Sequence, residues 1–335
     1  LSRFPKARPL SVMKAIRLSF VLRSFLCLAA LTAAPLAMGT PSSQELLPYT
    51  QPNGVVFKAR LFGDEFFNYY ADDTGHPLRY DSATGWWTYA LPAEEGVGAS
   101  SGLRVGIDPP PAPSTVEVPA EEVEASRTRT YTKSVPTPKL SKGKAITANP
   151  KVAMLLTTFS DRVANTDPSK PIYQPSDFET AFFATSDPNA RTASNLFKQM
   201  SYGAHNLTSG PGGIQGWVTA PKTHDYYGNG VGDPDPQTGR ENSSTVHELA
   251  RWRAQAADAT FDYGPYDTDN DGKVDLICIV YQGTSQANGG APSDIWPIRH
   301  GFTPFTSNDT NALGNPVTVS DYIIIPELSS PPTGT

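Results

Sequence analysis

The sequence predicts an α+β protein in which a small β-rich module precedes a larger domain built from a mixed sheet and helices. From residue 151 onward, short apolar and β-branched segments alternate with segments of helical periodicity. Before that, residues 45–100 contain strand-like segments separated by turn residues. The hydrophobic content of 38% is enough for a packed core and argues against wholesale disorder.

The first 39 residues are predicted to be an export signal. Met13 and the basic Lys14 precede an apolar segment, and small residues lie before a cut after Gly39. A basic start, an apolar stretch and a small-residue cleavage site together define a secretory signal. The alternative is an uncleaved membrane anchor. Residues 1–12 precede the first Met and are interpreted as an alternative start or an over-extended reading frame.

We therefore expect a secreted protein with no stable membrane anchor after the signal is removed. The whole chain has a formal charge of −6, and the predicted signal contains basic but no acidic residues. The remaining chain is more acidic still, which argues against a nucleic-acid partner. It would retain only Cys278 of the two cysteines, so no internal disulfide can form. In the absence of a disulfide, a bound cation would stabilise the loops.

Three regions follow the predicted signal. Residues 40–105 are expected to form the β-rich module, with strands at 55–61 and 86–90. Residues 106–148 are rich in Pro, Glu, Thr and Lys, which predicts an extended linker or a propeptide junction. A plain tether is the alternative to a processing site there. Residues 149–335 are expected to be globular.

The globular region contains segments with strand character and segments with helical periodicity. In one of the helical segments, Leu196, Phe197 and Met200 share an apolar face. Strands are predicted at residues 152–159, 215–219, 274–281 and 320–326, and helices at residues 175–184, 192–202 and 242–259.

The most specific local motif is Asp-Thr-Asp-Asn-Asp-Gly-Lys-Val-Asp at residues 267–275. Alternate carboxylates can surround one hard cation, and Gly272 permits the tight turn. The predicted calcium ligands are the side chains of Asp267, Asp269, Asp271 and Asp275 and the backbone carbonyl of Lys273. The motif is not an EF-hand, because Cys278 replaces the Glu of the twelfth position and a strand follows. The alternative is a solvated turn without an ion, in which the carboxylates would repel one another.

A second motif begins like the zinc-protease helix His-Glu-x-x-His. It is His247-Glu248-Leu249-Ala250-Arg251, in which a guanidinium stands where the second imidazole would be. Arginine cannot coordinate Zn²⁺, so an ordinary amphipathic helix is predicted. No two of the five histidines are spaced as a metal pair, and no nucleophile elbow or phosphate loop is present.

A series of short motifs occurs in order over most of residues 50–327. They are Gln51-Pro52-Asn53-Gly54, Gly63-Asp64-Glu65-Phe66-Phe67, Thr74-Gly75-His76-Pro77, Phe159-Ser160-Asp161, Phe197 with Met200-Ser201-Tyr202-Gly203, Gly216-Trp217-Val218, Tyr226-Tyr227-Gly228, the Asp-rich loop, Ile295-Trp296-Pro297 with Arg299-His300, and Tyr322 with Pro326-Glu327. This ordered series resembles the immune inhibitor A-like family of secreted metalloproteases, peptidase family M6.

The resemblance implies a zincin-like metalloprotease domain, here incomplete, with residues 40–105 as its pro-region. It also implies a zinc-dependent endopeptidase acting on protein or peptide substrates. In that family a zinc helix, His-Glu-x-x-His-x-x-Gly-x-Pro-Asp, follows the Pro-Glu strand. The sequence stops at Thr335, shortly after Glu327, without such a helix. We therefore expect a fragment that has no catalytic residue and no zinc ligand of its own, and that is inactive alone.

Two other functions remain open. One is a non-enzymatic, secreted, calcium-dependent binding or adhesion module. The other takes residues 40–148 as an inhibitor of a partner protease.

Overall fold

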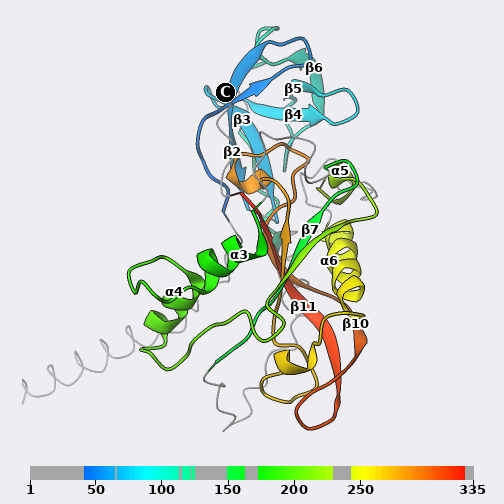
Figure 1. The fold of residues 1–335 in the computed structure, drawn as a ribbon. Coiled ribbons are helices and arrows are strands. Elements are labelled where there is room, and N and C mark those ends of the chain that lie inside the picture. The colour runs from blue at the N-terminus through cyan, green and yellow to red at the C-terminus, as the bar shows by residue number, and fades with distance from the viewer. Residues whose placement is uncertain are drawn as a thin grey trace, which may run out of the picture. The chain divides into compact units, whose positions relative to one another are not determined.

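The computed structural model describes residues 41–64, 66–112, 115–121, 123–124, 149–162, 173–228 and 243–328. These residues form two β-sheets and a small number of helices, which confirms the mixed α+β class (Figure 1). The predicted export signal and most of the predicted linker lie outside the described residues. Within the described part, none of the helices has the length and apolar character needed to cross a bilayer.

The first sheet is an antiparallel meander of six strands that pair in the order of the sequence. Phe57, Ala59 and Leu61 are buried while their neighbours face solvent, as expected for a strand with one covered face. The strands are β1 (Leu47–Thr50), β2 (Val56–Gly63), β3 (Asn68–Asp72), β4 (Pro77–Asp81), β5 (Trp86–Ala90) and β6 (Ser100–Arg104).

A buried glutamine ties this meander together. The Gln51 side-chain amide donates to the carbonyl oxygens of Trp87 at 2.9 Å and Val105 at 2.8 Å. Its Oε1 atom accepts from the backbone N–H of Trp87 at 2.9 Å. One side chain from the β1–β2 turn therefore satisfies backbone groups on and just beyond the last two strands, where the β5–β6 pairing is irregular.

The second sheet has five strands in the order β10-β11-β9-β7-β8. Strands β8, β7, β9 and β11 run parallel to their neighbours, and β10 runs antiparallel to β11. Every residue of β7 and β9 is buried, as expected for central parallel strands covered on both faces. The strands are β7 (Ala153–Thr158), β8 (Ile214–Thr219), β9 (Ile277–Tyr281), β10 (Ile298–Thr310) and β11 (Pro316–Pro326).

Helices cover both faces of this second sheet (Figure 1). Helix α6 packs Leu249, Ala250 and Ala254 against one face, and α3 with η1 packs Phe178 and Phe183 against the other. The helices are α3 (Pro175–Phe178), the π-helix η1 (Glu179–Phe183), α4 (Ala193–Met200), α5 (His224–Gly228), α6 (Ser243–Ala257), and the 3₁₀ turns η2 (Gly264–Tyr266) and η3 (Gln286–Asn288).

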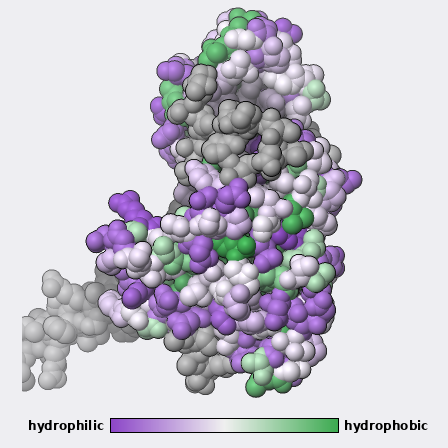
Figure 2. All heavy atoms as spheres, in the orientation of Figure 1, coloured by the Kyte–Doolittle hydropathy of each residue, from purple (hydrophilic) through white to green (hydrophobic). Residues whose placement is uncertain are grey.

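Helix α4 forms where it was predicted, but its apolar face is exposed. Leu196 is 56% and Met200 70% exposed. Polar residues anchor the opposite side: the Asn195 amide donates to the carbonyl oxygens of Asp187 at 2.7 Å and Ala190 at 2.9 Å. Elsewhere on the molecule, the face in Figure 2 carries its apolar side chains in small groups among polar ones.

Candidate metal centre

The Asp-rich loop connects η2 to β9 and is attached to the sheet at its base. The Asp275 N–H donates to the Tyr266 carbonyl at 2.9 Å and so closes the loop on itself. Thr318 of β11 donates to the Gly272 carbonyl and accepts from the Val274 N–H, both at 2.9 Å. The loop is therefore held by β11 before the chain enters β9.

Two residues of the loop have left-handed backbone geometry. Asn270 has a φ of 58° and Gly272 a φ of 87°. Glycine adopts this conformation without strain and asparagine tolerates it better than most residues, so the loop can turn tightly enough to bring its side chains together. The predicted role of Gly272 as the turn residue agrees with this geometry.

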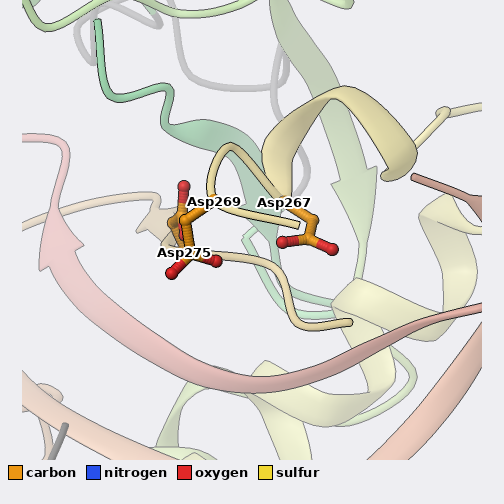
Figure 3. Close-up of side chains that lie close together, drawn as sticks. All are labelled: Asp267, Asp269 and Asp275. Atoms are coloured by element: carbon orange, nitrogen blue, oxygen red, sulfur yellow. The ribbon is translucent and has the colours of Figure 1, made fainter. Parts of the chain in front are cut away.

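Three of the predicted ligands come together. Oxygen atoms of Asp267, Asp269 and Asp275 all lie within 4.8 Å of one another, with Asp267 buried and Asp275 exposed (Figure 3). In Figure 3 the Asp269 and Asp275 side chains lie next to each other and Asp267 lies across from them. Such a group can hold a metal ion, and its donors are all carboxylate oxygens, which hard cations prefer.

Hydrogen bonds orient the buried member of this triad. Asp267 accepts from the backbone N–H groups of Asp271 and Gly272, each at 2.9 Å. The Asn311 side-chain amide donates to the same carboxylate at 2.7 Å. These donors hold Asp267 in one orientation, so the site is partly formed by the protein alone.

The carboxylates of the loop repel one another, and this repulsion affects the pKa values of Asp271 and Asp275. Burial, followed by the nearby Asp269 and Asp267 carboxylates, raises the pKa of Asp271. Asp275 is exposed, but the surrounding loop partly desolvates its carboxylate and raises its pKa, with Asp269 and Asp267 adding to the effect. The buried Oδ1 atom of Asn270 has no hydrogen-bond partner among the described residues. A cation held by the carboxylates would offset the repulsion.

Asp271 and Lys273 remain predictions as ligands. Asp271 is not one of the three clustered carboxylates, and its Oδ1 atom accepts from the Lys273 N–H at 3.0 Å. This is a local turn hydrogen bond, which a side-chain rotation would exchange for a metal contact.

The segment that begins like a zinc-protease helix does form an amphipathic helix, α6. Arg251 donates to the Thr303 carbonyl at 3.2 Å, and Glu248 accepts from the Tyr226 hydroxyl at 2.9 Å. His247, however, stacks on His300 of β10, with ring centroids 4.0 Å apart. Sequence reasoning missed this pair because it looked for short spacings, and His300 is brought to the helix only by the unpredicted strand β10.

A further polar cluster lies beyond the carboxyl ends of β7 and β9. The Arg162 guanidinium contacts the buried Asp294 carboxylate at 3.2 Å. The fully buried His224 ring lies between Asp294 at 3.6 Å and Asp225 at 3.7 Å, too far for a hydrogen bond to either. The His224 ring also lowers the pKa of Asp225. Both ring nitrogens of His224 therefore have no hydrogen-bond partner among the described residues, although two carboxylates flank the ring.

Comparisons of the chain with protein-family models, curated proteins and solved structures found no significant match.

Proposed function

We propose that this chain is part of a secreted zinc-dependent endopeptidase, and that its own metal centre is a structural Ca²⁺ site. The observation that carries the proposal is that the family-like motifs flank three neighbouring parallel strands. Asp161 follows β7 and Glu327 follows β11 at the carboxyl ends of these strands, whereas the Asp-rich loop precedes β9 at the opposite end. The pairing order places β9 between β7 and β11.

The choice of Ca²⁺ rests on the ligand chemistry. The clustered donors are carboxylate oxygens, and Ca²⁺ takes six to eight oxygen ligands in flexible geometry. Zn²⁺ prefers nitrogen and sulfur donors in a tetrahedral set. Among the described residues, this loop is the one group of three or more acidic, His or Cys side chains close enough to hold an ion. A catalytic zinc would need ligands from outside the described residues.

An endopeptidase must also bind an extended substrate. Strand β10 forms one edge of the second sheet, and no described strand pairs with its outer side. An extended peptide can add to such an edge through backbone hydrogen bonds. This supports a peptide or protein substrate, bound along β10.

The test of this function is enzymatic. We expect purified residues 1–335 to release no peptides from casein, because the zinc ligands and the catalytic Glu are not among them. A longer product of the same gene should contain His-Glu-x-x-His within a few tens of residues and should cleave casein. Its activity should be lost with a zinc chelator and restored by Zn²⁺. Casein hydrolysis by the 335-residue chain, or a longer product without a zinc motif, would contradict the proposal.

The second candidate is a non-enzymatic calcium-dependent binding module, which the carboxylate triad favours equally. It predicts a stop codon directly after residue 335. It also predicts that residues 149–335 alone unfold in one cooperative, Ca²⁺-stabilised transition.

A further inference from the structure

We propose that His224 is a proton-operated latch, which joins helix α5 to the loop of residues 282–294 when its ring carries two protons. The second proton comes from solvent. The charged ring then donates one hydrogen bond to Asp225 on α5 and one to Asp294 in the loop. The latch is independent of the Asp-rich loop and of the proposed protease function.

Each nitrogen of the His224 ring has its own carboxylate. The Nδ1 atom lies 3.7 Å from Asp225 Oδ1, and the Nε2 atom lies 3.6 Å from Asp294 Oδ1. A movement of less than about 1 Å on each side would bring both to hydrogen-bond distance. A neutral imidazole has one N–H and one lone pair, so it can donate to only one of the two carboxylates. The charged ring donates from both nitrogens and therefore matches this arrangement.

The ring is completely buried, and both of its nitrogens lack a hydrogen-bond partner among the described residues. Phe159 packs edge-on against it, with ring centroids 4.7 Å apart. Tyr281 of β9 lies 6.3 Å away, and its hydroxyl donates to a backbone carbonyl. An apolar side chain could fill this space without leaving polar atoms unpaired. The unpaired nitrogens therefore indicate that the site is complete only when the ring gains a proton.

The charges around the ring favour this proton. Besides Asp225 and Asp294, the carboxylate of Asp161 lies close, because it accepts from the backbone N–H of His224 at 2.8 Å. The guanidinium of Arg162 opposes them through its contact with Asp294 at 3.2 Å. Three carboxylates against one guanidinium leave an excess of negative charge, which stabilises the charged form of a histidine.

The other titratable groups near this cluster do not add charge to it. Burial raises the pKa of Tyr227 to about 12. Burial is also the main cause of the raised pKa of Tyr70 in β3, and the Asp294 charge adds to it. Both hydroxyls therefore stay neutral at ordinary pH. The Lys222 ammonium lies over the Tyr226 ring, 5.5 Å from its centroid.

Asp294 is fixed in place as an acceptor. Its Oδ2 atom accepts from the Thr284 hydroxyl at 2.8 Å and from the Ala291 N–H at 2.9 Å, both within its own loop. Its Oδ1 atom is left facing Arg162 and His224. The loop therefore carries its own preformed acceptor for the charged ring.

The latch lies where a loop can affect function. Residues 282–294 follow the carboxyl end of β9, which is parallel to β7, and ligands of open parallel sheets bind beyond such ends. Helix α5 already packs closely on this loop, since a Cβ atom on Gly228 would lie 2.0 Å from the Ser293 carbonyl oxygen. Closing the latch at low pH should therefore make the loop more ordered at this edge of the sheet.

The experiment is hydrogen exchange of residues 282–294 in the 335-residue chain at about pH 5.5 and about pH 8, on either side of the range in which histidines titrate. Excess Ca²⁺ is present, and rates are corrected for the intrinsic effect of pH on exchange. We expect at least about threefold more protection at the lower pH in the unaltered chain. His224→Gln should remove this difference, and Asp294→Asn should reduce it.

Two further variants separate a latch from a static contact. Arg162→Gln removes the competing cation, so it should keep the pH difference and move its midpoint to higher pH. His205→Gln is the matched control, because His205 also has a buried unpaired ring nitrogen, and it should keep the full difference. Nuclear magnetic resonance of nitrogen-15-labelled histidine should show two ring N–H groups for His224 at the lower pH.

Three results would overturn the proposal. They are an equal pH difference in His224→Gln and the unaltered chain, no pH difference in the unaltered chain, and a His224 ring with one N–H at both pH values. If His224→Gln fails to fold, Asp225→Asn decides the result, because the Asp225 side chain is 60% exposed and tolerates substitution. Asp225→Asn should reduce the pH difference, and an unchanged difference would refute the latch.

Discussion

The two sheets of this protein are assembled in different ways. Strands β1 to β6 pair in sequence order, so each strand meets the next one along the chain. Strands β7 to β11 pair out of order, and β9 lies between two strands that are distant from each other in sequence. The Asp-rich loop belongs to the second sheet: its carboxylates are neighbours in sequence, and Thr318 of the distant strand β11 holds the loop through backbone hydrogen bonds. The first sheet instead uses a buried polar residue, Gln51, to complete its own backbone hydrogen bonds.

The largest effects on stability should come from truncating a buried core side chain, one in each sheet. Leu155→Ala in β7 and Leu61→Ala in β2 each remove a buried side chain, and each should lower the free energy of unfolding by about 2–5 kcal/mol. In native-state hydrogen exchange, Leu155→Ala should reduce protection first in β7 and β9, and Leu61→Ala first in β2 to β5. Identical loss of protection in both sheets for both variants would show that the two sheets unfold as one unit.

Gln51→Leu tests how the first sheet is completed. The change removes the side-chain partner of the Trp87 N–H and of the Val105 carbonyl, while the Trp87 carbonyl still accepts from the Val105 N–H at 3.1 Å. A buried unpaired group costs about 1–3 kcal/mol. Allowing for relaxation, we expect about 2 kcal/mol less stability in urea unfolding. The control is Gln199→Leu on the exposed side of α4, which should change stability by less than about 0.5 kcal/mol. Equal effects of the two changes would mean that Gln51 does not hold the meander together.

The sequence could predict the local parts of this fold and site. The predicted strand at 86–90 coincides with β5, and the predicted helix at 242–259 contains α6. The Asp-rich loop was found because its carboxylates are neighbours in sequence. Strand β10 was missed because its 13 residues are largely polar and are interrupted by irregular pairing with β11. The His247–His300 pair was missed with it, since no local pattern reveals which strand pairs with which.

The smallest predicted effect concerns pH in the absence of Ca²⁺. The pKa values of Asp271 and Asp275 are raised in the folded state, so these groups bind protons more tightly there than in the unfolded chain. Their contribution to stability should therefore increase as the pH falls through the raised values towards the ordinary value of 3.8. With Ca²⁺ bound, protons compete with the ion and the trend should reverse. Thermal melts between pH 7 and pH 4, with Ca²⁺ or with a chelator, measure this. A variant carrying Asp271→Asn and Asp275→Asn should lose the difference, and an unchanged difference would place its origin elsewhere.

Binding of Ca²⁺ by residues 267–275 is tested by the melting temperature of the 335-residue chain with and without Ca²⁺. We predict that saturating Ca²⁺ raises the melting temperature of the unaltered chain, because an ion that binds only the folded state stabilises it by mass action. We also predict that Asp269→Ala combined with Asp271→Ala abolishes this rise. A rise of the same size in the double variant, or no rise in the unaltered chain, would show that residues 267–275 do not form a stabilising Ca²⁺ site.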